Sequence, residues 1–308
     1  MAGGGRPGLE GSGENSMTDD YSIWVLCYAR TKVSGDFMGG SPIASNTGTF
    51  EIPMLYTLVV SAPGTKARRV IAIDTGFGES GFASAEEKLS GMFTDIEWPT
   101  TVVGKIGFRP DDVDTVILTH MHADHAGNVA AFPNAKVYVQ REEYEGWTAL
   151  RRGELIKTAG PGSWALSSIN WENFDRFDEA IAAGRVTLLD GDRKIAPGVT
   201  CRLASQSHTF GSQWVEIETS SGPHIVAGDC VYWYANLEKM WPPGYIQGNP
   251  WNVMQVFEKM SGIIGDKLPR VVPGHDMEVF KRNVNWTVGL NPVAELHLAA
   301  GEKSRRPK

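Results

Sequence analysis

Four side chains of the types that bind transition metals stand within six consecutive residues of this 308-residue sequence. His120, His122, Asp124 and His125 form the pattern H-x-H-x-D-H, directly after the short apolar run TVILT. That run is typical of a buried strand, and strand alternation sends His120 and His122 to the same side, where both can hold one ion. We expect the turn that follows to direct Asp124 and His125 toward a second ion, because imidazole and carboxylate groups are common ligands of divalent metals.

Three further residues with ligand side chains come after later β-like runs. His208 follows VTCRLA, Asp229 ends HIVAGD, and His275 follows RVVPG. Carboxyl ends of strands are where open α/β assemblies collect their site residues, so we predict that these three join the motif. The remaining histidines, His224 and His297, stand inside a strand-like run and near the tail, and we expect both to be structural.

The chemistry of such a cluster is hydrolytic. Two divalent ions a few ångströms apart lower the pKa of a bridging water enough to supply hydroxide near neutral pH, so that no Ser or Cys nucleophile is needed. Ligands of nitrogen and oxygen without a thiolate suit Zn²⁺, while Mn²⁺, Fe²⁺ and Co²⁺ are also compatible. We therefore predict two divalent metal ions, with zinc the first choice.

The elements that must position these ligands are strands in both halves of the chain, with helices outside them. An apolar face at Val253, Val256, Phe257 and Met260 predicts a helix that packs on a sheet and begins at Asn249-Pro250. Together the elements predict two face-to-face sheets covered by helices. The β-like runs are 21–28, 54–60, 69–74, 115–119, 136–139, 185–189, 199–204, 213–219, 223–229 and 270–273, and a further helix is predicted over 83–92.

Two segments are predicted to lie over the site. Residues 33–50 are rich in Gly, Ser, Asn and Thr and read as a long functional loop. Residues 141–183 are helical in character and rich in Trp and Phe, and we interpret them as a cap insertion that helps to form an apolar pocket. Residues 1–16 are Gly-rich and are predicted to be a disordered leader, which leaves 17–308 as a single domain.

Composition restricts the partners. The net charge of −7 argues against a nucleic-acid partner, and no window approaches the ~18 consecutive apolar residues of a membrane span. The N-terminus lacks the features of a secretory signal. The three cysteines show no paired spacing and are expected to be reduced thiols of a cytoplasmic protein. We expect a small-molecule substrate, with a homodimer possible.

Taken together, H-x-H-x-D-H, the His before Thr-x-Gly, the Asp that ends a strand and the final Gly-His resemble the metallo-β-lactamase superfamily from about residue 21 to 275. The resemblance implies a four-layer αββα sandwich with the metals at one edge of the two sheets. Asp74-Thr75-Gly76 fits the superfamily's early Asp-Thr-Gly turn, and Asp74 would support the metal loop. The resemblance assigns the first metal to His120, His122 and His208, the second to Asp124, His125 and His275, and Asp229 to both.

Within the superfamily, the chain is most similar to the N-acyl homoserine lactonase group and its pyridoxolactonase relatives. Tyr232 stands three residues after Asp229, and the Gly274-His275-Asp276 ending matches that group. β-Lactamases of the superfamily usually carry Cys at the position of Asp229, and the flavin-linked members replace the residue at His122 by Glu. Ser207, where Gly is common, and the long 141–183 segment are departures that bear on the substrate.

The predicted function is therefore a dinuclear metal-dependent hydrolase that opens a lactone or related ester. In this interpretation the Tyr232 hydroxyl and one metal stabilise the developing oxyanion, and Asp124 carries a proton to the leaving alkoxide. Two alternatives are a glutathione thioester hydrolase of the glyoxalase II type and a mononuclear-iron persulfide dioxygenase. Metal content separates the dioxygenase from the lactonase, since the dioxygenase needs one iron and the lactonase two ions.

Overall fold

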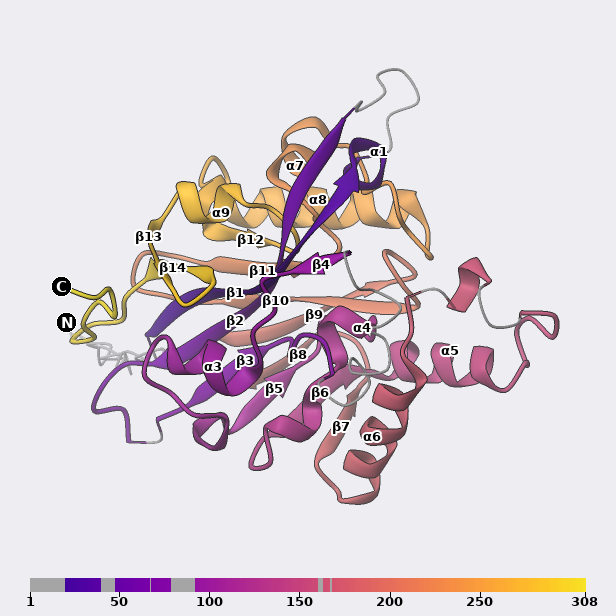
Figure 1. Ribbon diagram of the computed structural model, residues 1–308, viewed down its shortest axis with the longest axis horizontal. Coiled ribbons are helices and arrows are strands. Elements are labelled where there is room, and N and C mark those ends of the chain that lie inside the picture. The colour runs from indigo at the N-terminus through magenta and orange to yellow at the C-terminus, as the bar shows by residue number, and fades with distance from the viewer. Residues whose placement is uncertain (1–19, 40–47, 67, 79–91, 160–162, 167) are drawn as a thin grey trace, which may run out of the picture.

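Two β-sheets lie face to face in the computed structural model, with helices on both outer sides (Figure 1). The structure describes residues 20–39, 48–66, 68–78, 92–159, 163–166 and 168–308. The predicted leader and residues 83–91 of the predicted helix lie outside these ranges. Helix α8 covers one sheet and helices α3 and α6 cover the other, which gives the expected αββα order of layers.

The larger sheet joins the two ends of the chain. Its strand order is β13-β14-β1-β2-β3-β5-β6-β7, with β4 paired to β1. The pairs from β3 to β7 are parallel and the others are antiparallel. Its strands are β1 (Tyr21–Ser34), β2 (Thr49–Ser61), β3 (Val70–Ile73), β4 (Phe93–Thr94), β5 (Thr115–Ile117), β6 (Lys136–Gln140), β7 (Val186–Leu189), β13 (Val284–Val288) and β14 (Asn291–His297).

The smaller sheet has the order β12-β11-β10-β9-β8 and comes entirely from the second half of the chain. Its strands are β8 (Arg193–Ala196), β9 (Val199–Ser205), β10 (Gly211–Ile217), β11 (His224–Gly228) and β12 (Val271–Pro273). The α-helices are α1 (Gly35–Met38), α3 (Pro99–Gly104), α4 (Ala123–Ala126), α5 (Arg141–Arg151), α6 (Trp171–Ala182), α7 (Tyr234–Lys239), α8 (Pro250–Ile264) and α9 (Glu278–Lys281). Single 3₁₀ turns are η1 (Pro110–Asp112), η2 (Val129–Ala131), η3 (Trp164–Leu166) and η4 (Leu268–Arg270).

Strand β1 shows how the sheets are held together, because it is buried on both faces. Ile23 and Val25 belong to the apolar cluster that includes the smaller sheet and α8, whereas Trp24 and Leu26 belong to the cluster that includes α3 and α6. Alternate side chains of one strand thus enter two cores, as the two-residue period of a strand requires. At about 25 cal/mol per Å² of apolar surface, such double burial is a main source of stability.

Helix α8 confirms the predicted helix start at Asn249-Pro250 and the predicted apolar face. The Asn249 side chain accepts a hydrogen bond from the Trp251 amide at 2.9 Å, and Pro250 occupies the first helical turn. Val253, Val256, Phe257 and Met260 are all buried in the cluster below. No helix in the described part of the chain combines the length and apolar character needed to cross a membrane.

One expectation, the length of the loop over 33–50, is corrected. The loop predicted over 33–50 is shorter, because β1 continues to Ser34, α1 follows, and β2 begins at Thr49. The 13 register pairs between β1 and β2 extend past the apolar runs into residues that are partly exposed, where periodicity gives little signal. The C-terminal hairpin β13–β14 was not predicted, although β14 pairs with β1 and carries His297.

Candidate metal centre

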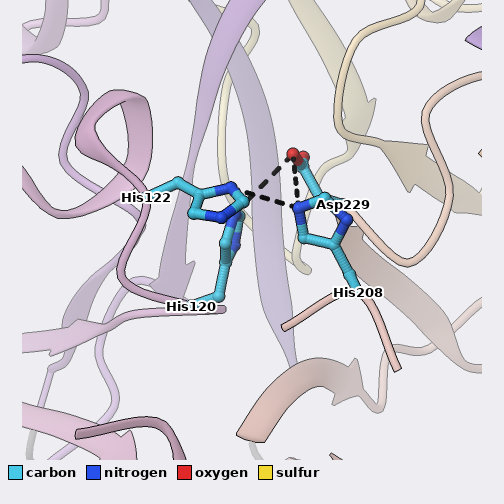
Figure 2. Close-up of side chains that lie close together, drawn as sticks. All are labelled: His120, His122, His208 and Asp229. Carbon is cyan, nitrogen blue, oxygen red and sulfur yellow. Dashed lines mark hydrogen bonds and ion pairs between the residues drawn. The ribbon is translucent and has the colours of Figure 1, made fainter. Parts of the chain in front are cut away.

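Seven predicted ligand residues come together as two neighbouring groups. The first ligand group is His120, His122, His208 and Asp229, and the second ligand group is Asp124, His125 and His275. Within each group the ligand atoms lie within 4.8 Å of one another. Figure 2 shows the first group, with the His122 and His208 rings and the Asp229 carboxylate directed toward one another.

Asp229 faces both groups. Its Oδ2 lies 3.4 Å from His208 Nε2 and 3.7 Å from His120 Nε2. Its Oδ1 lies 3.2 Å from both His125 Nε2 and His275 Nε2. A carboxylate with one oxygen on each side can serve two ions at once, which is the position that the sequence resemblance gave to Asp229.

The order of the strands explains why these residues meet. His120 follows β5, Asp229 follows β11 directly, and His275 comes two residues after β12. His122 stands at the N-terminus of α4 with extended backbone angles, so Asp124 and His125 enter a helical turn and change direction. His208 lies in the connection between β9 and β10. The expected division of the H-x-H-x-D-H motif between two groups is therefore seen.

Asp74 contacts the second ligand group directly and supports His120 through Thr119. Its Oδ2 lies 2.8 Å from His125 Nδ1, and its Oδ1 accepts a hydrogen bond from the Thr119 amide at 2.7 Å. The Thr119 hydroxyl lies 3.0 Å from His120 Nδ1. Asp74 has a left-handed backbone with φ of 64°, unusual for a residue other than glycine, which the buried hydrogen bonds hold in place. The carboxylate thus fixes the rings of two ligands.

Sequence reasoning missed Glu143, which is completely buried and supports the first group. Its Oε1 accepts hydrogen bonds from the Met121 amide and the Trp147 indole, both at 2.8 Å. Its Oε2 accepts from the Thr209 hydroxyl at 2.7 Å and the Gly211 amide at 2.8 Å. Glu143 thereby ties the loop of His120 and His122 to the loop of His208. Nothing in the sequence distinguishes it from its exposed neighbour Glu142.

The donor set fits divalent metal ions. Three buried ligand atoms have no hydrogen-bond partner among the described residues, namely His120 Nε2, His125 Nε2 and Asp229 Oδ1. Buried polar atoms are normally paired, so unpaired imidazole nitrogens that converge with a carboxylate indicate a cation site. The opposite ring nitrogens are held: His125 by Asp74, His120 by Thr119, and His275 by the Pro53 carbonyl at 3.1 Å. Such outer partners orient metal-binding imidazoles.

The two groups differ in electrostatics. In the first group, burial lowers the pKa of His208 to about 3 and that of His120 well below its usual value, with neighbouring histidines adding to the effect on His120. In the second group, burial also disfavours the charged form, but Asp229 and Asp124 raise the pKa values of His125 and His275 above the usual value. Burial would raise the pKa of Asp229, but His275 and His125 hold it well below its usual range.

A cavity of about 650 Å³ opens onto both groups. Its lining includes the ligands His122, Asp124, Asp229 and His275. The predicted cap contributes residues 168–173, and the 33–50 segment contributes Val33 and Phe37. Further apolar side chains come from Ile52, Met54, Phe77, Met92, Phe93, Ile169, Trp171, Tyr232 and Tyr245. The described lining contains no Lys or Arg.

Tyr232 lies beside both ligand groups and lines the cavity. Its ring centroid is 5.6 Å from that of His208 and 5.2 Å from that of His275, and it stacks on Phe37. Its hydroxyl donates a hydrogen bond to the Tyr245 carbonyl at 3.0 Å. Tyr232 is therefore part of the cavity wall.

The aromatic residues of the predicted cap, and Tyr234 after Asp229, have different surroundings. Trp171 lines the cavity, whereas Trp147 is buried against the His122 ring and Phe210. Trp164 is 59% exposed, and the Tyr234 hydroxyl donates to the Val271 carbonyl. His224 and His297 lie with their ring centroids 5.5 Å apart and belong to neither ligand group, as expected. Cys27, Cys201 and Cys230 are free and buried.

Comparisons with known proteins agree with this geometry. The family model described as the metallo-beta-lactamase superfamily matches residues 58–275. An N-acyl homoserine lactonase of Bacillus thuringiensis is 28% identical over 218 residues, which cover 68% of this chain and 77% of that protein. The N-acyl homoserine lactonase AttM of Rhizobium johnstonii is 26% identical over 245 residues, covering 75% and 84%.

Solved structures show the same fold. A crystal structure of a B. thuringiensis AiiA mutant with N-decanoyl-L-homoserine bound at its active site has a TM-score of 0.61 and 22% identity, covering 86% of this chain and 96% of that one. A probable metal-dependent hydrolase from Staphylococcus aureus has a TM-score of 0.63 and 21% identity, covering 84% and 90%.

Proposed function

The chain belongs to the metallo-beta-lactamase superfamily, and from this premise we propose that it is a dinuclear metal-dependent hydrolase that opens a lactone or related ester of a small molecule. One observation carries the proposal: two ligand groups that share Asp229 lie at the wall of a largely apolar cavity. The matched relatives named as N-acyl homoserine lactonases support this substrate class.

We propose that His120, His122, His208 and Asp229 hold one ion and that Asp124, His125, His275 and Asp229 hold the other. When bound, the two ions would supply Lewis acidity and lower the pKa of a coordinated water. Zinc suits these ligands, and Mn²⁺, Fe²⁺ and Co²⁺ remain compatible. The chain itself contributes the orientation of the imidazoles through Asp74 and Thr119.

Tyr232 and Asp124 are the residues that we propose to act on the substrate. Tyr232 lies in the cavity wall, and we propose that its hydroxyl turns from the Tyr245 carbonyl to donate its hydrogen to an oxyanion as it forms. Asp124 is 22% exposed and lines the cavity. Burial would raise the pKa of Asp124, but His125 and His275 lower it to about 2, so the side chain is ionised near neutral pH. We propose that this carboxylate takes the proton released by the attacking water and passes it to the leaving alkoxide.

The cavity favours a neutral substrate with an apolar substituent. Glutathione carries two carboxylates, and a site for it would be expected to offer Arg or Lys partners. The described lining offers neither. A lactone with an acyl chain or ring presents no charge and can place its apolar part against Phe37, Ile52 and Trp171. We propose that residues 141–183 act as the cap over this substrate within a single domain that spans 17–308.

A hydrolysis panel tests the proposal. Purified protein is assayed against N-acyl homoserine lactones, aromatic lactones and a glutathione thioester, with elemental analysis of the same sample. The proposal predicts two ions per chain and a kcat/KM for the best lactone far above that for the thioester. A higher kcat/KM for the thioester, or one iron per chain in place of two ions, would replace the proposal with the alternative functions.

A further inference from the structure

Gln247 connects the cap to one of the metal ligands. It lies in the connection between α7 and α8, is partly buried, and its side chain reaches His122. Its Oε1 lies 2.8 Å from His122 Nε2. Its Nε2 donates to the backbone carbonyls of Trp164 at 3.1 Å and Ala165 at 3.4 Å, in the η3 turn of the cap.

These contacts determine which ring nitrogen of His122 carries the hydrogen. An amide nitrogen only donates and an amide oxygen only accepts, so the two carbonyls of η3 fix the Nε2 side of Gln247. The Ser168 hydroxyl, 3.3 Å from Oε1, is a further donor toward the oxygen. Oε1 therefore faces His122, and a hydrogen bond at this distance requires a hydrogen on His122 Nε2.

The other ring nitrogen is then free to bind a cation. His122 Nδ1 lies 3.2 Å from His208 Nε2, inside the first ligand group. A neutral imidazole protonated at Nε2 has its lone pair on Nδ1. The hydrogen bond from Gln247 thus selects the one tautomer of His122 that can serve as a ligand in this position.

We propose that Gln247 is a positioning residue that holds His122 in its metal-binding tautomer and links the cap to the affinity of the first ion. The inference rests on the proposed two-ion site. It assigns to the cap a role in holding a ligand in addition to forming the cavity wall. The same side chain contacts η3 and His122, so a cap displaced from its place would also release the His122 ring.

Two variants separate the acceptor from the cap contacts. Gln247→Leu removes both the acceptor and the donors. Gln247→Glu keeps an oxygen for His122 and loses the donors to Trp164 and Ala165. Asn285→Leu is the matched control. Asn285 lies on a strand that carries no ligand, and its Nδ2 also donates to two backbone carbonyls, those of Phe280 and Asn283.

The experiment titrates Zn²⁺ into chelator-treated protein against a competing indicator. Because partners of metal-binding histidines typically contribute 10- to 100-fold to metal affinity, we expect Gln247→Leu to weaken one of two Zn²⁺ sites by about that factor. The other site should keep its affinity. Gln247→Glu should weaken that site less than Gln247→Leu does, since it keeps an acceptor for His122 but loses the donors that fix the side chain to the cap. Asn285→Leu should bind both ions normally.

A second readout reports the tautomer directly. Nitrogen-15 shifts of the His122 ring in the chelator-treated chain should show a hydrogen on Nε2 in wild type and in Gln247→Glu, and a mixture in Gln247→Leu. Two wild-type affinities in Gln247→Leu, or an equal loss in the Leu and Glu variants, would overturn the inference.

The two proposals fail in different ways. A wild-type chain that binds no Zn²⁺ would overturn both. A chain that shows the expected Zn²⁺ affinities but hydrolyses no lactone would contradict the proposed function and leave the role of Gln247 supported.

Discussion

The two ligand groups of the centre are built differently. The first group is almost closed to solvent, and its loops are held by the buried Glu143 through backbone amides and a hydroxyl. The second group includes Asp124, which is 22% exposed, and its His125 ring is held directly by the Asp74 carboxylate. The Glu143 carboxylate thus supports the first group through the loops that carry it, whereas the Asp74 carboxylate contacts a ring of the second group directly.

This difference suggests different roles for the two ligand groups that Asp229 faces. Burial lowers the pKa values of His120 and His208, so these histidines are neutral near pH 7 and can bind a cation without first losing a proton. The second group carries the exposed carboxylate on the cavity side, where a substrate's leaving group can reach it. We expect variants to act on one group or the other according to which anchor they remove.

Asp229 belongs to the first group and faces the second, so its loss should have the largest effect. Asp229→Ala leaves two cation sites without the shared carboxylate. Outer partners of metal ligands are typically worth 10- to 100-fold, so loss of a shared ligand should lower kcat/KM by more than about 100-fold and reduce bound metal. Elemental analysis and turnover of the best lactone measure both. Two retained ions with normal turnover would rule out the bridging position.

Asp74→Asn should affect the second group first. The Asn side chain has one oxygen in place of two, so it can no longer accept hydrogen bonds from both the Thr119 amide and the His125 ring. The His125 ring also loses its charged partner. We expect affinity for one ion to fall about 10- to 100-fold. Competition titration with Zn²⁺ measures this loss, and equal weakening of both sites would show that Asp74 supports the two groups alike.

Tyr232→Phe tests the side chain that lies beside both ligand groups in the cavity lining. If the hydroxyl stabilises the oxyanion, kcat and kcat/KM should fall together by about 10-fold or more with both ions retained. The variant also leaves the Tyr245 carbonyl without this donor, so the melting temperature is measured in parallel. A change in stability with lactone turnover within twofold of wild type would leave Tyr232 with a structural role alone.

Glu143→Gln should act on stability through the first group. Each of its two carboxylate oxygens accepts two hydrogen bonds, so the new NH₂ must face donors whichever way the amide is turned. Buried donors left unpaired cost about 1–3 kcal/mol, so thermal unfolding should shift down by several degrees. The neighbouring exposed Glu142→Gln is the control and should stay within about 0.5 kcal/mol. Equal effects of the two substitutions would contradict the anchoring role.

Much of the centre could be predicted from the sequence because its ligands follow strand ends in a dense motif. The H-x-H-x-D-H spacing alone indicates two groups, and the family match confirms the resemblance drawn from it. Glu143 and Gln247 could not be predicted, since their roles depend on contacts between loops far apart in the chain. The same reason hid β13 and β14, whose pairing with β1 joins the two ends of the chain.

Metal reconstitution followed by lactone hydrolysis tests the central claim most directly. Chelator-treated protein receives Zn²⁺ in increments while turnover of an N-acyl homoserine lactone and bound metal are measured together. The account predicts that activity rises until two ions per chain are bound and then levels off. Full activity at one ion, or no ester hydrolysis with two ions bound, would contradict it.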